Sequence, residues 1–141
     1  QLDIDRCLIE KGRLQARRVA AFMQRHGIIA EAVLSSPYPR AVQTAAIACK
    51  EAGFAAASEQ AWLALETPTE VAYRHLTEQL TTLPAHTLLV GHEPDFSALI
   101  SRLLGSDKLL LNIRKASLTC VGFSSESGCF ELQWSIPARF M

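Results

Sequence analysis

Two side chains of this 141-residue sequence have the chemistry and the setting to hold a phosphate group. Arg40 follows the short apolar run "AVLSS", and His92 follows the run "HTLLVG". A guanidinium presents a planar fork of donors that matches two phosphate oxygens. An imidazole can donate to a further oxygen and, when cationic, stabilise the charge of a transferred phosphoryl group. Arg40 and His92 are therefore candidates for phosphate binding, with or without catalysis.

The elements predicted around these residues put both at one edge of a sheet. Residues 30–36 and 86–92 are short apolar runs that predict buried strands, and a helical pattern follows each of them. Strands that alternate with helices form a parallel sheet covered on both faces, and its ligands bind outside the carboxyl ends of the strands. We therefore expect Arg40 and His92 to converge on one pocket at that edge.

The rest of the chain continues the alternation and ends on a hairpin. Helices are predicted over 8–24, 41–52, 68–81 and 94–104, a weak edge strand within 54–63, and two further strands over 116–123 and 129–136. Ser36 and Thr67 are the expected caps of the second and third helices, and Pro37 fits a first helical turn. This order predicts a single domain over residues 1–141, a three-layer α/β/α sandwich with a mostly parallel central sheet and an antiparallel strand near the C-terminus.

Composition argues against nucleic acid, membrane and metal as partners. Lys plus Arg and Asp plus Glu each number 14, so no basic excess attracts nucleic acid or anionic lipid. The apolar runs are too short to span a bilayer. Cys7, Cys49, Cys120 and Cys129 form no C-x-x-C pair, and no histidine stands at zinc-ligand spacing from them. We expect a cytoplasmic protein with reduced, mostly buried thiols and with neither a metal nor a cofactor.

Several segments of the sequence together resemble one family. They are "LIEKGRLQA" near the start, "VLSSPYPRAVQTA" around Arg40, "LLVGHEPDFSALISRLLG" around His92, and the closing "RKASLTCVGF" and "LQWSIPARF". The sequence resembles the histidine phosphatase superfamily, which has the phosphoglycerate mutase-like fold, and within it the small phosphohistidine phosphatases of the SixA type. The two middle segments are the specific ones, and the resemblance covers nearly the whole chain.

The resemblance implies a phosphatase that forms a covalent phosphohistidine intermediate. Arg40 and His92 would hold the phosphoryl group, and no metal would take part. The implied substrate is a phosphohistidine on a protein of the phosphorelay or phosphotransfer type. A small-molecule phosphomonoesterase or mutase of the same superfamily is an alternative. A phosphate- or phosphoprotein-binding module without catalysis is an alternative of another class.

The nucleophile of such an enzyme is not expected in the visible sequence. In the family, a strand that ends in R-H-G precedes the first long helix. Here Arg25, His26 and Gly27 end a helical pattern, where basic side chains favour the helix dipole and glycine caps the helix. We expect these residues to lie away from the site and the 1–141 domain to lack the R-H-G strand. That strand is expected upstream of Gln1, inserted between the strands at 30–36 and 86–92.

Other polar residues near the motifs receive weaker predictions. Glu66 lies in a loop that could reach the site, so it is either a general acid or a solvated carboxylate. Ser35 and Ser36 are expected to be turn and cap residues, since no G-x-S-x-G elbow surrounds them. His75 and His86 are assigned no role.

Overall fold

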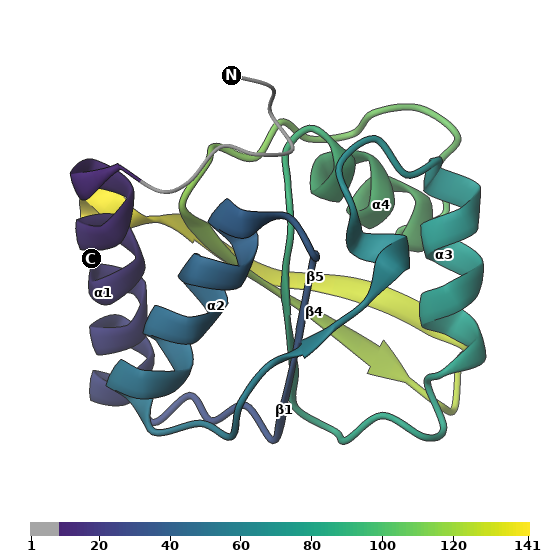
Figure 1. The fold of residues 1–141 in the computed structure, drawn as a ribbon. Coiled ribbons are helices and arrows are strands. Elements are labelled where there is room, and N and C mark those ends of the chain that lie inside the picture. Colours follow the sequence, from purple (N-terminus) through teal and green to yellow (C-terminus); the bar gives the residue numbers. More distant parts are fainter. Residues whose placement is uncertain (1–8) are drawn as a thin grey trace.

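Helices lie on both sides of a parallel sheet in the computed structural model, which describes residues 9–141 (Figure 1). In chain order the elements are α1 (Glu10–Arg25), β1 (Ala32–Ser35), α2 (Pro39–Ala52), β2 (Ser58–Glu59), the 3₁₀ turn η2 (Ala61–Leu63), α3 (Thr69–Glu78), β3 (Thr87–Val90), α4 (Asp95–Leu103), β4 (Ser117–Ser124), β5 (Cys129–Pro137) and the 3₁₀ turn η3 (Ala138–Phe140). Helices α1 and α2 lie to one side of the sheet, and α3 and α4 lie to the other. The predicted α/β class is confirmed.

The parallel sheet has the strand order β2-β1-β3. Strand β1 pairs with β3 over four residues, from Ala32 opposite Thr87 to Ser35 opposite Val90. On its other edge β1 pairs with the two-residue strand β2. Strands β4 and β5 form an antiparallel hairpin, which is a separate two-stranded sheet within the described residues. The antiparallel element near the C-terminus is thus where the sequence predicted it.

The predicted insertion of a strand between β1 and β3 is wrong. These two strands bond to each other directly, so their facing backbone groups are already used. Within residues 9–141, no strand pairs with the other edge of β3 or with the edge of β4 that faces away from β5. A further strand can therefore join this fold only at one of the remaining edges.

Alternation along β1 and β3 divides the core into two clusters. Val33 packs with Leu88 and Val90 in a cluster that includes Ala45 of α2. Leu34 and the neighbouring Leu89 face the opposite way. Their cluster contains residues from η2, α3 and α4, namely Trp62, Leu63, Ala72, Leu76 and Leu99. Since successive side chains of a strand point to opposite faces, each apolar run supplies both cores.

The start of α2 differs from the prediction because of its prolines. The helix begins at Pro39 rather than around Pro37, and Tyr38 is the residue at its N-cap. A residue that precedes proline is held in an extended conformation, and Tyr38 has ψ 141°. Ser36 is consequently outside the helix and is not its cap.

The start of α3 corrects the second predicted cap. The hydroxyl of Thr67 donates to the carbonyl of Ala64 instead of capping the helix. Pro68 stands at the N-cap, and α3 ends at Glu78, three residues earlier than predicted. Proline again fixes the boundary, because Thr67 cannot adopt the helical conformation readily before it.

Two expectations from composition are tested in part. Cys49 is buried, Cys120 is half-buried and Cys129 is exposed, so "mostly buried" is wrong for these three free cysteines. Burial raises the pKa of the Cys49 thiol. Cys7 lies outside the described residues. No helix within residues 9–141 has the length and apolar character needed to cross a bilayer.

Candidate active site

His92 joins the carboxyl ends of two neighbouring strands. Strand β3 ends at Val90, and only Gly91 separates it from His92. His92 is 6% exposed. Its Nε2 lies 2.7 Å from the Oγ of Ser36, which follows β1 directly. Its ring centroid lies 5.3 Å from the ring of Tyr38 in the same turn. The imidazole is therefore held against the β1–α2 turn at the sheet edge where ligands bind.

The backbone of His92 is fixed by the first turn of α4. Its carbonyl accepts a hydrogen bond from the Phe96 N–H at 2.9 Å. The carboxylate of Glu93 accepts from the Ser97 N–H at 3.2 Å and also from the Ser97 hydroxyl. Burial raises the pKa of Glu93, and these bonds from Ser97 oppose the rise. The residue next to His92 is thus tied to the helix that follows, which limits movement of the imidazole.

Gly91 allows β3 to pass close to an aromatic ring. A Cβ atom at this position would lie 2.7 Å from Cζ of Phe96. Phe96 packs against the core cluster that contains Leu34 and Leu99. The ring therefore has little room to move, so the residue before His92 must lack a side chain.

Gly91→Ala should lower the free energy of unfolding by about 1–3 kcal/mol, the usual cost of overpacking a filled core. Urea unfolding measures this loss. Gly122→Ala is the matched control, because its Cβ would also lie 2.7 Å from a side-chain atom, Nε2 of Gln133. Gln133 is exposed and flexible, so the control should change stability by less than about 0.5 kcal/mol. Equal losses in the two variants would contradict the close approach to Phe96.

Arg40 is the second residue of α2, directly after the turn that contacts His92. Its side chain is half-exposed, and its carbonyl accepts a hydrogen bond from the Thr44 hydroxyl at 2.9 Å. The first turn of a helix carries the positive end of the dipole and unpaired amides, which favour a bound anion. The structure thus puts Arg40 beyond the carboxyl end of β1 and His92 beyond that of β3. Convergence of the two side chains on one phosphate stays a prediction.

The tripeptide at positions 25–27 ends a helix, as predicted. Helix α1 ends at Arg25, His26 is its C-cap, and Gly27 has the left-handed φ of 65°. The His26 ring is exposed and packs on Phe22, with centroids 4.4 Å apart. Figure 1 shows that this end of α1 leads into the start of β1. His92 instead follows the carboxyl end of β3, which runs parallel to β1, so the two histidines lie at opposite ends of the strands. His26 is therefore not placed to act with Arg40.

The two remaining histidines also lie off this edge. His86 precedes β3 at its amino end, and its Nδ1 lies 3.2 Å from Oε1 of Glu31. His75 is exposed on α3, and its ring stacks on Trp62 with centroids 6.0 Å apart. Of the four histidines in the sequence, His92 is the one at the carboxyl ends of the parallel strands.

Glu66 is tied by its backbone to the helix that follows His92. Its N–H donates to Oδ2 of Asp95 at 2.7 Å, and Glu66 has a left-handed φ of 67° that is unusual for a residue with a side chain. Asp95 and His92 line the same small hollow. Burial raises the pKa of Asp95, and the bond from Glu66 opposes this. The loop thus lies near the site, but the Glu66 side chain is exposed and its role as an acid stays a prediction.

Asp95 lines this hollow, although nothing in the sequence singles it out. It lies in the first turn of α4, and its contact with Glu66 spans 29 residues of sequence. An acidic residue in a first helical turn is common for reasons of helix stability, so its type and position gave no separate signal.

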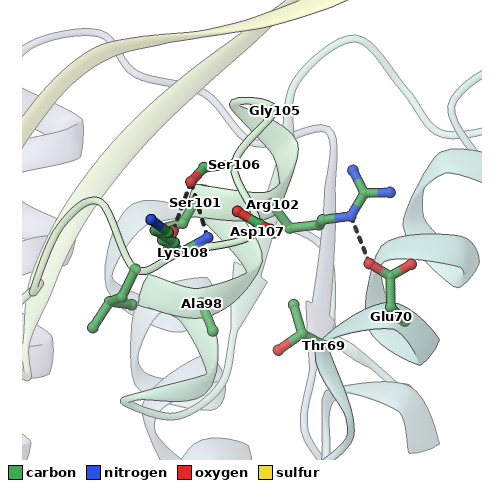
Figure 2. A pocket seen from close by; sticks show the side chains of 10 residues that line it. Thr69, Glu70, Ala98, Ser101, Arg102, Gly105, Ser106, Asp107 and Lys108 are labelled. Carbon is green, nitrogen blue, oxygen red and sulfur yellow. Dashed lines mark hydrogen bonds and ion pairs between the residues drawn. The ribbon is translucent and has the colours of Figure 1, made fainter.

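A second surface hollow lies elsewhere (Figure 2). It measures about 570 Å³ and lies between the start of α3, the end of α4 and the loop over 105–109. Nε of Arg102 donates to Oε1 of Glu70 at 2.5 Å, and its guanidinium lies 3.8 Å from the centroid of the Tyr73 ring. Neither Arg40 nor His92 lines this hollow. In the part of the chain that the structure describes, no group of three His, Cys, Asp or Glu residues is arranged to hold a metal ion.

The first part of the sequence matches one family model. Residues 1–66 match the family described as the histidine phosphatase superfamily (branch 1). These residues include the turn after β1 and Arg40. A search of curated protein sequences finds no match. The resemblance to the histidine phosphatase superfamily is therefore confirmed, in sequence over this segment and in fold over nearly the whole chain.

Similar solved structures include proteins of the SixA type. The protein histidine phosphatase SixA complexed with tungstate has a TM-score of 0.87 and 21% identity, over 99% of this chain and 88% of that one. A SixA protein from Agrobacterium tumefaciens has a TM-score of 0.77 and 21% identity, over 96% and 86%. A mycobacterial glucosyl-3-phosphoglycerate phosphatase with inorganic phosphate has a TM-score of 0.78 and 18% identity, over 99% and 92%. At these identities the likeness defines the fold.

Proposed function

We propose that this protein is a phosphatase that works through a covalent phosphohistidine intermediate and dephosphorylates histidine residues of another protein. One observation carries the proposal. His92 is buried at the carboxyl end of β3 and hydrogen-bonded to the turn that leads into Arg40. An imidazole and a guanidinium fixed on adjacent elements can stabilise the charge that develops on phosphoryl oxygens, because they need little reorganisation during the reaction.

In this proposal the nucleophile is a histidine that is not among the four of the present sequence. Its ring nitrogen forms a bond to phosphorus while the bond between phosphorus and the leaving imidazole breaks. Water then attacks phosphorus, the new P–N bond breaks, and inorganic phosphate leaves. Arg40 and His92 hold the phosphoryl oxygens in both steps. The leaving imidazole can depart already protonated, which lessens the need for a general acid such as Glu66.

We place the strand that carries this nucleophile along the unpaired edge of β3. Strand β3 is bonded on its β1 side, whereas its other edge has no strand partner within residues 9–141. An unpaired backbone group that is shielded from water costs about 1–3 kcal/mol, so a strand there would stabilise the sheet. The carboxyl end of a parallel strand at this edge would lie beside His92. This position replaces the one between β1 and β3.

The hollow beside His92 is too small to enclose a substrate. The hollow that His92 and Asp95 line holds only about 10 Å³. Pockets that enclose a small ligand are usually about 300–1,000 Å³. The body of any substrate, a protein or a small ester, must therefore lie outside this hollow.

Two other functions have support of their own. A glucosyl-3-phosphoglycerate phosphatase shares the fold, which favours a small phosphate ester as the substrate. Three of the four histidines lie away from the carboxyl edge, which favours a phosphate-binding module if no further histidine reaches the site.

The test compares three substrates with the full-length protein. They are a phosphotransfer protein phosphorylated on histidine, p-nitrophenyl phosphate and glucosyl-3-phosphoglycerate, and the readout is kcat/KM for phosphate release. We expect the highest kcat/KM for the phosphohistidine protein. A higher value for either small ester would favour a small-molecule phosphatase. Binding of inorganic phosphate without any turnover would identify a binding module.

A further inference from the structure

We propose that Ser36 is a positioning residue that donates a hydrogen bond to Nε2 of His92 and so keeps the neutral ring protonated on Nδ1. The effect of this hydrogen bond on turnover rests on the function proposed above. The contact itself does not. Ser36 is 0% exposed and His92 is 6% exposed, and Oγ and Nε2 are 2.7 Å apart. With water excluded, a hydrogen bond of this length strongly biases the protonation of the ring.

The direction of the bond follows from counting the partners of Ser36. A hydroxyl has one proton to donate and two lone pairs. One lone pair accepts from the Tyr38 N–H at 3.2 Å. Among the described residues, Nε2 of His92 is the acceptor within reach of the hydroxyl proton. If Nε2 carried the proton instead, the fully buried hydroxyl would lack an acceptor, which costs about 1–3 kcal/mol.

The resulting tautomer suits a residue that binds a phosphoryl group. With Nε2 accepting from Ser36, the neutral ring carries its proton on Nδ1, which is then a donor. A phosphoryl oxygen accepts hydrogen bonds, so a donor attracts it and a nitrogen lone pair repels it. If the ring becomes cationic, the hydroxyl can rotate and accept from Nε2–H, and Nδ1 remains a donor. Nδ1 is therefore a donor in both protonation states, and the bond from Ser36 favours the neutral one.

The structure also provides a matched control one residue away. Ser35 is 1% exposed, and its hydroxyl donates to the carbonyl of Ser36 at 2.7 Å. Ser35→Ala removes an equally buried hydroxyl without removing the partner of His92. A general effect of losing a buried hydroxyl in this turn should therefore appear in both alanine variants. An effect on the protonation of the ring should appear only in Ser36→Ala.

The test is a long-range ¹H–¹⁵N correlation spectrum of the imidazole nitrogens in the full-length protein, recorded at a pH where His92 is neutral. We expect the wild-type ring to be protonated on Nδ1, with Nε2 as the acceptor. Ser36→Ala should move the proton wholly or partly to Nε2, whereas Ser35→Ala should leave it on Nδ1. A wild-type ring protonated on Nε2 overturns the proposal, as does an unchanged pattern in Ser36→Ala. If Ser36→Ala fails to fold, the wild-type spectrum still decides.

A second measurement connects the tautomer to turnover. Ser36→Ala should lower kcat about 10- to 100-fold, the range for losing a residue that orients a functional ligand, with little change in KM. Ser36→Thr, which keeps the hydroxyl, should recover part of the loss. A larger effect on KM than on kcat contradicts the positioning role. If the wild-type protein releases no phosphate from any substrate, the proposed function fails, while the spectrum still tests the Ser36–His92 bond.

Discussion

His92→Ala should lower kcat for phosphate release by about 10²–10³-fold, the loss for one preorganised donor to developing charge. The imidazole is buried at the end of β3 and bonded to Ser36, so it is fixed before the substrate arrives. Its removal leaves phosphoryl oxygens without a donor that is strongest in the transition state. The variant should also lose stability, because the Ser36 hydroxyl then lacks its partner.

The control for this prediction is His75→Ala, which removes an exposed ring from α3. It should leave kcat within about twofold, as surface changes away from a site usually do. Urea unfolding of both variants separates a catalytic loss from unfolding. If His92→Ala remains folded and turns over at the wild-type rate, His92 is a structural residue, and the phosphatase proposal loses the observation that carries it.

Local sequence signals predicted the two strands that lead to this site and the end of α1. Short apolar runs identified β1 and β3, because a strand buried on both faces needs consecutive apolar residues. Gly27 identified the end of α1, because glycine adopts the left-handed conformation without a steric penalty. The placement of Arg40 and His92 after two strands of one sheet followed from these signals, whereas the direct pairing of those two strands did not. Such features depend on neighbours in sequence, so a single chain reveals them.

Contacts between distant segments could not be predicted in the same way. The bond between Ser36 and His92 spans 56 residues, and that between Glu66 and Asp95 spans 29. Each depends on how a turn packs against the start of α4, which residue types do not specify. The predicted neighbour of β3, a strand inserted between β1 and β3, was wrong for a related reason. Apolar runs identify which segments are strands, but the edge at which each one pairs depends on the whole sheet.

Arg40→Ala should lower kcat/KM by about 10³-fold. This is the upper end of the loss of about 10²–10³ that follows removal of one preorganised hydrogen-bond donor, because the guanidinium is charged and can bind two oxygens. Arg40→Lys keeps the charge but loses the planar fork, so it should recover only part of this loss. Lys50→Ala is the control, since this exposed cation lies in the last turn of the same helix and away from the site. Calorimetry with inorganic phosphate should show weaker binding for Arg40→Ala and wild-type binding for Lys50→Ala.

A double variant then tests whether Arg40 and His92 act on one phosphoryl group. Residues that act as a unit show strongly non-additive effects, whereas independent sites add in free energy. We therefore expect Arg40→Ala combined with His92→Ala to lose much less kcat/KM than the product of the two single losses. Full additivity would mean that the two side chains work at separate places. Wild-type phosphate affinity and turnover in Arg40→Ala would make Arg40 an ordinary solvated residue at a helix start, and the two strand ends would then not form a single site.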